Sequence, residues 1–332
     1  MSARLRVGVL GCSDVAWRRT LPALQAAPRV ELVAVASRDS AKAQRFASNF
    51  SCVATTYSDL LDRDDIDAVY MPLPPALHLP WGAKVLSAGK HLLSEKPLAS
   101  SAAEARQLLQ RARENGVLLR ENFTFLHHPQ HESVRKLMAS GRLGAVRSFS
   151  GAFCFPPLPA SDIRYSAHLG GGSLRDAGVY PIRAAQLLFG NDLTLSGSVL
   201  RVDPGRGVDL AGQALLVSAD GVPITVQFGF QHSYGSFYSV WGSAGRLHLD
   251  RAFTPPADWR PVLRIDAEEI ALEPEHQFQR AVESFADAVL AGVTVTDTDE
   301  ARRCADTLRT MELVDQISRQ AVRVNETETA DE

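Results

Sequence analysis

The segment Val7–Ala16 reads VGVLGCSDVA, the pattern of a buried strand, a tight turn and the start of a helix. In the dinucleotide-binding fingerprint G-x-G-x-x-G/A, glycines let the backbone approach a pyrophosphate, and the helix N-terminus faces its charge. The three positions are Gly11, Ser13 and Ala16, so serine replaces the second glycine. The strand before the turn and the helix after it favour a cofactor loop over an ordinary turn. The predicted cofactor-binding residues of this loop are Gly11, Cys12, Ser13, Asp14, Val15 and Ala16.

Residues 1–123 alternate short apolar runs with amphipathic stretches, and this alternation predicts the fold. The expected strands are Arg6–Leu10, Glu31–Ala36, Asp67–Met71, Lys90–Ser94 and Val117–Arg120. The expected helices are Val15–Ala26, Ser40–Asn49, Ala76–Ala88 and Ala102–Glu114. Strands that read as continuous apolar runs and alternate with helices are typical of a parallel sheet covered on both faces. We therefore predict an α/β Rossmann domain over these residues.

The pattern changes near residue 124, and a second domain is expected over residues 124–324. One helix follows Pro129 and ends at Gly141. Strand-like runs then follow closely, which favours an α+β domain with an open, mostly antiparallel sheet. These runs are Val146–Phe155, Leu195–Val202, Gln213–Ser218, Ile224–Gln231, Phe237–Trp241 and Arg246–Leu249. The accompanying helices are Asp176–Phe189, His276–Ala291 and Asp299–Gln320, and the acidic tail 325–332 is expected to be disordered.

The end of the second strand bears on the choice of nicotinamide cofactor. NAD-preferring Rossmann domains place an acidic residue there, on the ribose 2′-hydroxyl. This chain has Ser37 and Arg38, a hydroxyl and a guanidinium that suit a 2′-phosphate. Asp39 is the alternative ribose ligand, but it is better placed to cap the helix that begins at Ser40. The sequence thus favours NADP(H) over NAD(H).

Three further segments carry candidate chemistry. MPLPPALH follows the third expected strand and contains Leu73, Pro74 and His78, whereas Glu95-Lys96-Pro97 follows the next strand. Ligands of open α/β sheets lie beyond the carboxyl ends of the strands, which places both turns at the nicotinamide end. His78 is a candidate nicotinamide-side contact or, alternatively, a capping or packing residue. The third segment, GGGSLRDAGVYP, belongs to the second domain.

In the order GCSDVA, EKP and D-x-G-x-x-Y-P, these segments resemble the Gfo/Idh/MocA oxidoreductase family over nearly the whole chain. The resemblance implies that Lys96 is catalytic, that a cis peptide precedes Pro97, and that Glu95 belongs to the cofactor site. It also makes Arg164, in DIRYSAHLGGG, a candidate contact to cofactor or substrate.

The final motif departs from the inositol dehydrogenase pattern, because Tyr180 stands where those enzymes have histidine. Tyrosine there is similar to the sugar 3-ketoreductases of nucleotide-deoxysugar pathways. The stretches AWRRTLPAL, ENFTFLHHPQH and GGGSLRDAGVYPIRAAQLLFG also resemble those enzymes. The resemblance implies NADPH-dependent reduction, at C3, of a nucleotide-linked keto-deoxysugar, a reaction of antibiotic biosynthesis.

Ketone reduction needs a hydride at carbon and a proton at oxygen as charge develops there. Asp176 and Tyr180 are four residues apart, so at a helix start they face the same way. We expect Tyr180 to donate the proton, Lys96 to stabilise phenolate and alkoxide, and Asp176 to orient substrate hydroxyls. The alternative is that Lys96 is itself the donor. Arg19 is either a surface charge or a contact to an anionic substrate.

A metal site is not expected. His127 and His131 are four residues apart, beside His128, but Pro129 interrupts them and no HExxH pattern is present.

Composition narrows the partners and the compartment. The net charge of −3 and the lack of a basic block argue against a nucleic-acid or membrane partner. The N-terminus lacks a signal-peptide layout, and four widely spaced cysteines suit a reducing cytoplasm. We expect a small-molecule nucleotide-sugar substrate and a homodimer or homotetramer that pairs through the open sheet. The alternatives are a polyol or aldose dehydrogenase, a silent NADP-binding regulator and an NAD-using glycoside hydrolase.

Overall fold

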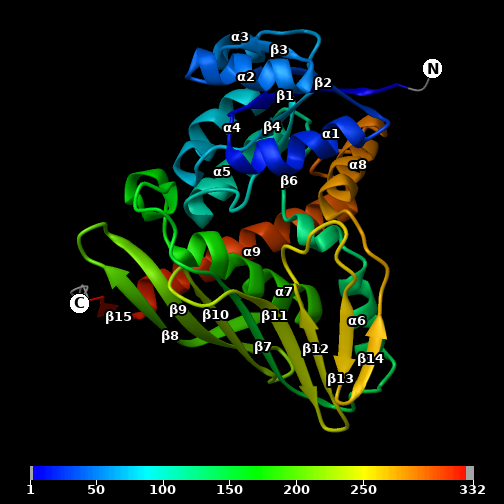
Figure 1. The fold of residues 1–332 in the computed structure, drawn as a ribbon, viewed down its shortest axis with the longest axis vertical. Helices are drawn as coiled ribbons and strands as arrows, with labels where there is room; N and C mark the ends of the chain where they lie inside the picture. Colours follow the sequence, from blue (N-terminus) through cyan, green and yellow to red (C-terminus); the bar gives the residue numbers. More distant parts are fainter. Residues whose placement is uncertain (1–2, 327–332) are drawn as a thin grey trace. The chain divides into compact units, whose positions relative to one another are not determined.

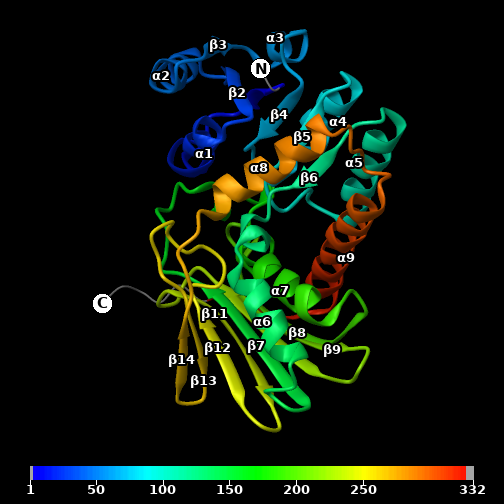
Figure 2. The ribbon, with the colours of Figure 1, turned by 90° about the vertical axis from the view of Figure 1, so that its right-hand side faces the viewer.

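The computed structural model describes residues 3–326, which divide into two compact units (Figures 1 and 2). Unit 1 contains the residues up to 127 together with 277–308. Unit 2 contains 128–276 together with the residues from 309 onward. This division differs from the predicted boundary, because 277–308 return to the first unit.

Unit 1 is built on a six-stranded parallel sheet, in the order β3-β2-β1-β4-β5-β6. Its strands are β1 (Leu5–Leu10), β2 (Val30–Ala36), β3 (Val53–Thr55), β4 (Ala68–Met71), β5 (His91–Ser94) and β6 (Leu119–Glu121). The strand order reverses between β1 and β4, the position where Rossmann sheets bind dinucleotides. The predicted Rossmann sheet is confirmed, and β3 is an additional edge strand that the sequence reading missed.

Helices cover both faces of this sheet. The helices of this unit are α1 (Leu21–Ala26), α2 (Ser40–Phe50), α3 (Tyr57–Leu61), α4 (His78–Ser87), α5 (Ala102–Glu114) and α8 (Gln277–Leu290). Val7 and Val9 face a core shared with α1, α2 and α8. A Cβ on Gly8, between them, would lie 2.8 Å from Ile66 and 3.2 Å from Leu60, so the opposite face packs on α3.

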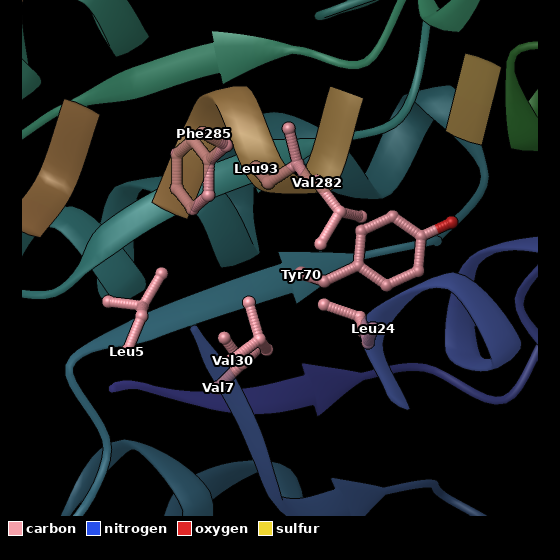
Figure 3. A pocket seen from close by; sticks show the side chains of 8 residues that line it. All are labelled: Leu5, Val7, Leu24, Val30, Tyr70, Leu93, Val282 and Phe285. Atoms are coloured by element: carbon pink, nitrogen blue, oxygen red, sulfur yellow. The ribbon is translucent and has the colours of Figure 1, made fainter. Parts of the chain in front are cut away.

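Helix α8 explains why a C-terminal segment belongs to unit 1. Its buried side chains Val282, Phe285 and Ala286 join the apolar core of the Rossmann sheet. Figure 3 shows Val282 and Phe285 of α8 beside Leu93 and Tyr70, around a small apolar gap. Burying this face against the sheet removes it from water. The free energy gained in this way outweighs the entropy cost of bringing together segments far apart in the chain. The Tyr70 hydroxyl points away from this apolar group (Figure 3).

Unit 2 is built on a nine-stranded sheet, in the order β14-β13-β12-β11-β7-β10-β9-β8-β15. Its strands are β7 (Val146–Cys154), β8 (Leu193–Asp203), β9 (Val208–Ser218), β10 (Pro223–Gly229), β11 (Gly235–Gly242), β12 (Arg246–Asp250), β13 (Val262–Ile265), β14 (Glu268–Ala271) and β15 (Val322–Asn325). The pairs β7–β10 and β8–β15 are parallel and the others antiparallel. The mostly antiparallel sheet is therefore confirmed.

One face of this sheet carries helix α7 (Val179–Phe189), seen beside β7 and β10 in Figure 1. Phe189 packs edge-on against Phe149 of β7, with ring centroids 5.7 Å apart. A Cβ on Gly151 would lie 3.1 Å from Pro181, so this glycine lets the helix approach the strand. The remaining helices are α6 (Gln130–Ala139) and α9 (Thr298–Gln320), which begins in unit 1 and ends in unit 2.

The C-terminal segment differs in part from the prediction. The expected disordered tail begins at Asn325, but Asn325 ends β15, and Glu326 forms an ion pair with Arg201 of β8 at 2.8 Å. Pairing with β8 supplies backbone hydrogen bonds that composition does not reveal. The rest of the predicted tail, 327–332, lies outside the described residues.

Candidate active site

The predicted cofactor loop connects β1 to a five-residue π-helical turn, Ala16–Thr20. Gly11 has φ of +123°, and a Cβ there would lie 2.8 Å from the Leu73 side chain. Its N–H donates to the carbonyl of Ala36 at 3.0 Å. The loop therefore passes between the end of β2 and Leu73, along a path that only glycine takes without strain. A tight glycine turn that leads into a helix N-terminus fits a bound pyrophosphate.

Ser13 explains why the fingerprint tolerates the loss of its second glycine. Its hydroxyl accepts a hydrogen bond from the N–H of Ala16 at 3.2 Å. The serine therefore satisfies one of the free backbone donors at the start of the helix. Val15 is half-buried, and the exposed Asp14 pairs with Arg18 on the next turn. Arg19, the predicted substrate contact, is exposed in the same π-helical turn.

The end of β2 gathers several cations. Burial raises the pKa of the Cys12 thiol to about 11, opposed by the nearby positive charges of Lys42 and Arg45 and by hydrogen bonding to Ser37. Arg38 is exposed. Burial likewise raises the pKa of Tyr57, and the Arg38 guanidinium opposes that rise. Lys42 was missed by the sequence analysis. The only signal for it was its position, four residues after Arg38.

Asp39 is confirmed as the cap of α2. Its carboxylate accepts from the N–H of Lys42 at 3.0 Å, and its own N–H donates to the Ser37 hydroxyl at 3.2 Å. The Asp39 carboxylate thus caps the N-terminus of α2 and is not positioned as the ribose ligand of an NAD site.

The turn after β5 carries Lys96 and contains the expected cis peptide, Lys96-Pro97. Glu95 is held beside it, because one carboxylate oxygen accepts from the Tyr70 hydroxyl at 2.9 Å and from the Asn122 amide at 2.8 Å. Thr20 lies 2.9 Å from the same tyrosine oxygen. Burial raises the pKa of Glu95, while the hydrogen bonds from Asn122 and Tyr70 and the charge of Lys96 oppose it.

The same turn is held on its far side as well. The N–H of Leu98 donates to Glu121 at 2.8 Å, and the second carboxylate oxygen of Glu121 accepts from Thr307 at 2.8 Å. His78, at the start of α4, is fully buried and lies against the carbonyl of Pro97. The residues on both sides of Lys96 are therefore fixed by buried side chains of other elements.

In unit 2, Asp176 and Arg164 form an ion pair. The Arg164 Nε lies 2.6 Å from an Asp176 oxygen, and its Nη1 lies 3.2 Å from Asp162. The charge of Asp176 and then its hydrogen bond hold the pKa of Arg164 above its usual range, against burial. The structure thus brings together two residues that the sequence assigned separately.

Tyr180 is half-buried and packs against two phenylalanine rings that also contact each other. Phe153 meets it edge-on with centroids 4.9 Å apart, and Phe253 lies 5.6 Å away. Asp176 falls in a second π-helical turn, Leu174–Gly178, and Tyr180 is in the first turn of α7. Such π-helical turns are frequent at functional sites.

Asp209 of β9 holds the glycine-rich residues that come just before Asp176 in the chain. One of its oxygens accepts from the Ser173 hydroxyl at 2.7 Å and from the N–H of Leu174 at 2.6 Å. A Cβ on Gly172 would lie 2.5 Å from the other oxygen. Sequence reasoning missed Asp209, as it missed Tyr70 and Asn122, because each acts from a different element and no local motif marks it.

The histidines singled out in the sequence have protein partners. His131 is buried, with Nδ1 2.8 Å from the Tyr238 hydroxyl, and burial lowers its pKa to about 3. The carbonyl of His127 accepts from Arg280 at 3.0 Å. Within residues 3–326, no three His, Cys, Asp or Glu side chains form a group that could hold a metal ion.

None of the helices in the described part of the chain combines the length and the apolar character that a membrane crossing requires.

Comparison with known proteins matches both parts of the chain to families. Residues 5–123 match an oxidoreductase family with an NAD-binding Rossmann fold, and 131–248 match the Gfo/Idh/MocA C-terminal domain. The dTDP-3,4-didehydro-2,6-dideoxy-alpha-D-glucose 3-reductase of Saccharopolyspora spinosa is 49% identical, over 90% of this chain and 91% of that protein. Its counterpart in Actinomadura kijaniata is 48% identical, over 94% of each chain.

A solved structure gives the same result. The 3-ketoreductase from Actinomadura kijaniata, in complex with NADP and TDP-benzene, superimposes with a TM-score of 0.94. It is 46% identical, and the match covers 98% of this chain and 100% of that one. That enzyme has also been solved with a tyrosine changed to phenylalanine and with a lysine changed to alanine.

Proposed function

The chain belongs to the Gfo/Idh/MocA oxidoreductase family, and we propose that within it the protein is an NADPH-dependent sugar 3-ketoreductase. Its substrate is a dTDP-linked 3,4-diketo-2,6-dideoxy sugar, reduced at C3 to the alcohol. The product enters deoxysugar synthesis of the kind that serves antibiotic pathways. When bound, NADPH supplies the hydride for this reduction.

One observation carries the proposal. Identity of 48–49% to two 3-reductases extends over 90% or more of this chain, which carries both Lys96 and the D-x-G-x-x-Y segment. A silent regulator has no need of Lys96 and Tyr180 together, and an inositol-type dehydrogenase would carry histidine in place of Tyr180. The relatives support the ketoreductase over these alternatives.

The reacting groups follow from the chemistry of ketone reduction. Tyr180 donates its phenolic proton to the oxygen of the former C3 ketone as the hydride reaches the carbon. The ammonium of Lys96 stabilises the alkoxide and the phenolate. Asp176 orients the substrate hydroxyls, and its ion pair with Arg164 holds the carboxylate in one position.

We propose that NADP(H) occupies the loop after β1, a path that supports close approach of a pyrophosphate. Ser37, Arg38 and Lys42 supply the hydroxyl and two positive charges for the 2′-phosphate. Leu73, Pro74 and Glu95 belong to the nicotinamide end, and His78 acts there through the backbone. The remaining cofactor residues are Gly11, Cys12, Ser13, Asp14, Val15, Ala16 and Arg164.

Arg19 is proposed to contact the diphosphate of the substrate, because it is an exposed cation on the turn that begins at Ala16. The substrate contacts are thus Arg19, Lys96, Asp176 and Tyr180.

We propose a homodimer or homotetramer that pairs through the sheet of unit 2. Val199, Leu215 and Trp241 are exposed on the same face of this sheet, at 41%, 41% and 57%. Exposed apolar side chains on a broad strand surface favour pairing with an identical copy. A reducing cytoplasm is the proposed location, because all four cysteines carry free thiols.

The test is stoichiometric oxidation of NADPH by the purified protein with the dTDP-linked diketosugar. Product analysis should find the 3-hydroxy sugar and NADP⁺ in equal amounts. Binding of NADPH without any reduction of this sugar would contradict the assignment, whereas faster oxidation of a free polyol would support the dehydrogenase alternative.

A further inference from the structure

His78 links two turns through a single buried ring. Its Nε2 lies 2.8 Å from the carbonyl oxygen of Leu73, and its Nδ1 lies 2.9 Å from that of Pro97. The residue is 0% exposed. The ring therefore acts inside the protein, on the backbone of the turn that follows β4 and of the turn that follows β5.

Both turns belong to the proposed cofactor and catalytic site. The Leu73 side chain packs on Gly11, where a Cβ would come within 2.8 Å of it. Pro97 directly follows Lys96 in the cis peptide. One imidazole thus ties the support of the pyrophosphate loop to the turn that carries the catalytic lysine.

The two contacts depend on which ring nitrogens carry a proton. Carbonyl oxygens only accept, so each contact is a hydrogen bond only where the facing nitrogen carries a proton. The neutral ring has one N–H and holds one turn, whereas the imidazolium has two and holds both. Burial lowers the pKa of His78, as does the charge of Lys96, and the carbonyls of Leu73, Pro97 and Leu98 act in the opposite direction.

We propose that His78 is a positioning residue that carries a proton on both ring nitrogens, because a carbonyl oxygen faces each of them, and that the two nitrogens have separate tasks. Nδ1 fixes the Lys96 turn for catalysis, and Nε2 fixes the Leu73 turn for cofactor binding. This inference rests on the proposed function for its first half only, because cofactor binding is measured without any sugar. Displacing a catalytic group by about 1 Å can cost up to 10²-fold in rate, so the fixed turn matters for turnover.

Two variants separate the tasks. The amide nitrogen of asparagine reaches about as far as the Nδ1 of histidine, and that of glutamine about as far as Nε2. His78→Asn therefore keeps a donor for Pro97 and loses the one for Leu73, whereas His78→Gln does the reverse. His78→Phe keeps the ring and loses both donors.

The experiment measures single-turnover oxidation of saturating NADPH with the ketosugar, and the Kd of NADPH by fluorescence titration. We expect hydride transfer to be about tenfold slower in His78→Gln than in His78→Asn, as for a misplaced catalytic group. We expect the NADPH Kd to be several-fold higher in His78→Asn than in His78→Gln, as for one lost hydrogen bond. His78→Phe should show both losses.

The control is His91, at the amino end of β5, whose Nδ1 accepts from the N–H of Leu118 at 2.9 Å. The same changes there should lower the melting temperature without separating rate from affinity. The proposal would be overturned if His78→Asn and His78→Gln changed the rate and the Kd equally and differed from the unmodified protein only through a lower melting temperature. If the unmodified protein bound NADPH but reduced no ketosugar, the proposed function would fail, and reversed Kd values in the two variants would still overturn the role of Nε2.

Discussion

The turn that carries Lys96 and the segment that carries Tyr180 are held in place by different forces. Around Lys96, polar side chains make directed hydrogen bonds: the buried Tyr70 and Asn122 donate to Glu95, and the half-buried Glu121 accepts from the N–H of Leu98. Around Tyr180, two phenylalanine rings pack against the phenol. The lysine turn depends on donors and acceptors, and the tyrosine depends on shape.

This contrast suits the two tasks. A flexible lysine gains precision only if its backbone is fixed, because its side chain retains many rotamers. A tyrosine has two side-chain torsions, so packing of its ring fixes the hydroxyl. Loss of one hydrogen-bond donor should therefore disturb the lysine turn, whereas the tyrosine site should tolerate removal of its hydroxyl without moving.

The largest expected effect comes from that hydroxyl. Tyr180→Phe keeps the ring that packs against Phe153 and Phe253 and removes only the proton donor. Hydride transfer should slow by roughly 10²–10⁴-fold, with little change in NADPH affinity. Single-turnover NADPH oxidation measures this rate.

Lys96→Met provides the companion variant, and it should also slow turnover. If the two groups act as one unit, the double variant should be little slower than the slower single variant. A near-normal rate in Tyr180→Phe, together with no activity in Lys96→Met, would make Lys96 the proton donor.

The next largest expected effect is a loss of stability of unit 2 in acid, caused by protonation of His131. Burial lowers its pKa to about 3, below the value of about 6.5 in an unfolded chain. The folded state therefore favours the neutral ring, and the stability it contributes above about pH 6.5 is lost as the pH falls toward 3. By linkage, the loss between pH 7 and pH 4 is roughly 3 kcal/mol in the free energy of unfolding.

Urea denaturation at both pH values tests this loss, and His131→Gln should be less sensitive to acid than the unmodified protein. His127 of unit 1 is a parallel case, because burial lowers its pKa to about 3 as well. Equal acid sensitivity with and without His131 would exclude that ring as the cause.

Arg38 tests the cofactor end of unit 1. NADPH should bind more tightly than NADH, and Arg38→Ala should narrow the difference by about 1.5–3 kcal/mol, the value of a hydrogen bond to a charged group. Lys42→Ala should narrow it in the same direction. Titrations with both cofactors measure the difference, and equal affinities in the unmodified protein would refute the 2′-phosphate assignment.

Tyr70→Phe sharpens the comparison directly. It removes one donor to Glu95 and leaves the ring in the apolar core. The free energy of unfolding should fall by about 1–3 kcal/mol, because a buried carboxylate loses a partner. Turnover should fall as well, since Glu95 adjoins Lys96. The conservative Phe153→Leu beside Tyr180 is the matched packing variant, and a larger rate loss there than in Tyr70→Phe would reverse the contrast.

The smallest expected effect is that of a chelator. Dialysis against one should leave the rate of NADPH oxidation unchanged, because the proposed chemistry needs only NADPH and protein side chains. Activity that is lost on dialysis and restored by zinc would contradict this and direct attention to His127 and His131.

Local sequence patterns predicted most of the fold. The apolar runs before Gly11 and Met71, with helical stretches between them, identify parallel strands whose burial is continuous along the chain. They failed for β3, β13, β14 and β15, which are three or four residues long and occupy sheet edges or lie beside them. Such strands depend on pairing with a neighbour, and pairing leaves little periodicity in the sequence.

The candidate site divides in the same way. Local motifs were enough to identify the residues that carry the chemistry: the loop at Gly11, Lys96 in EKP, and Asp176 with Tyr180 one helical turn later. The groups that hold these residues in place are apparent only in the folded chain. His78, Asn122 and Asp209 act across elements that folding brings together, and α8 joins the Rossmann core although more than 270 residues precede it. A motif records which atoms are needed, whereas hydrogen bonds and apolar burial between distant segments form only when the backbone has closed, so no local pattern records them.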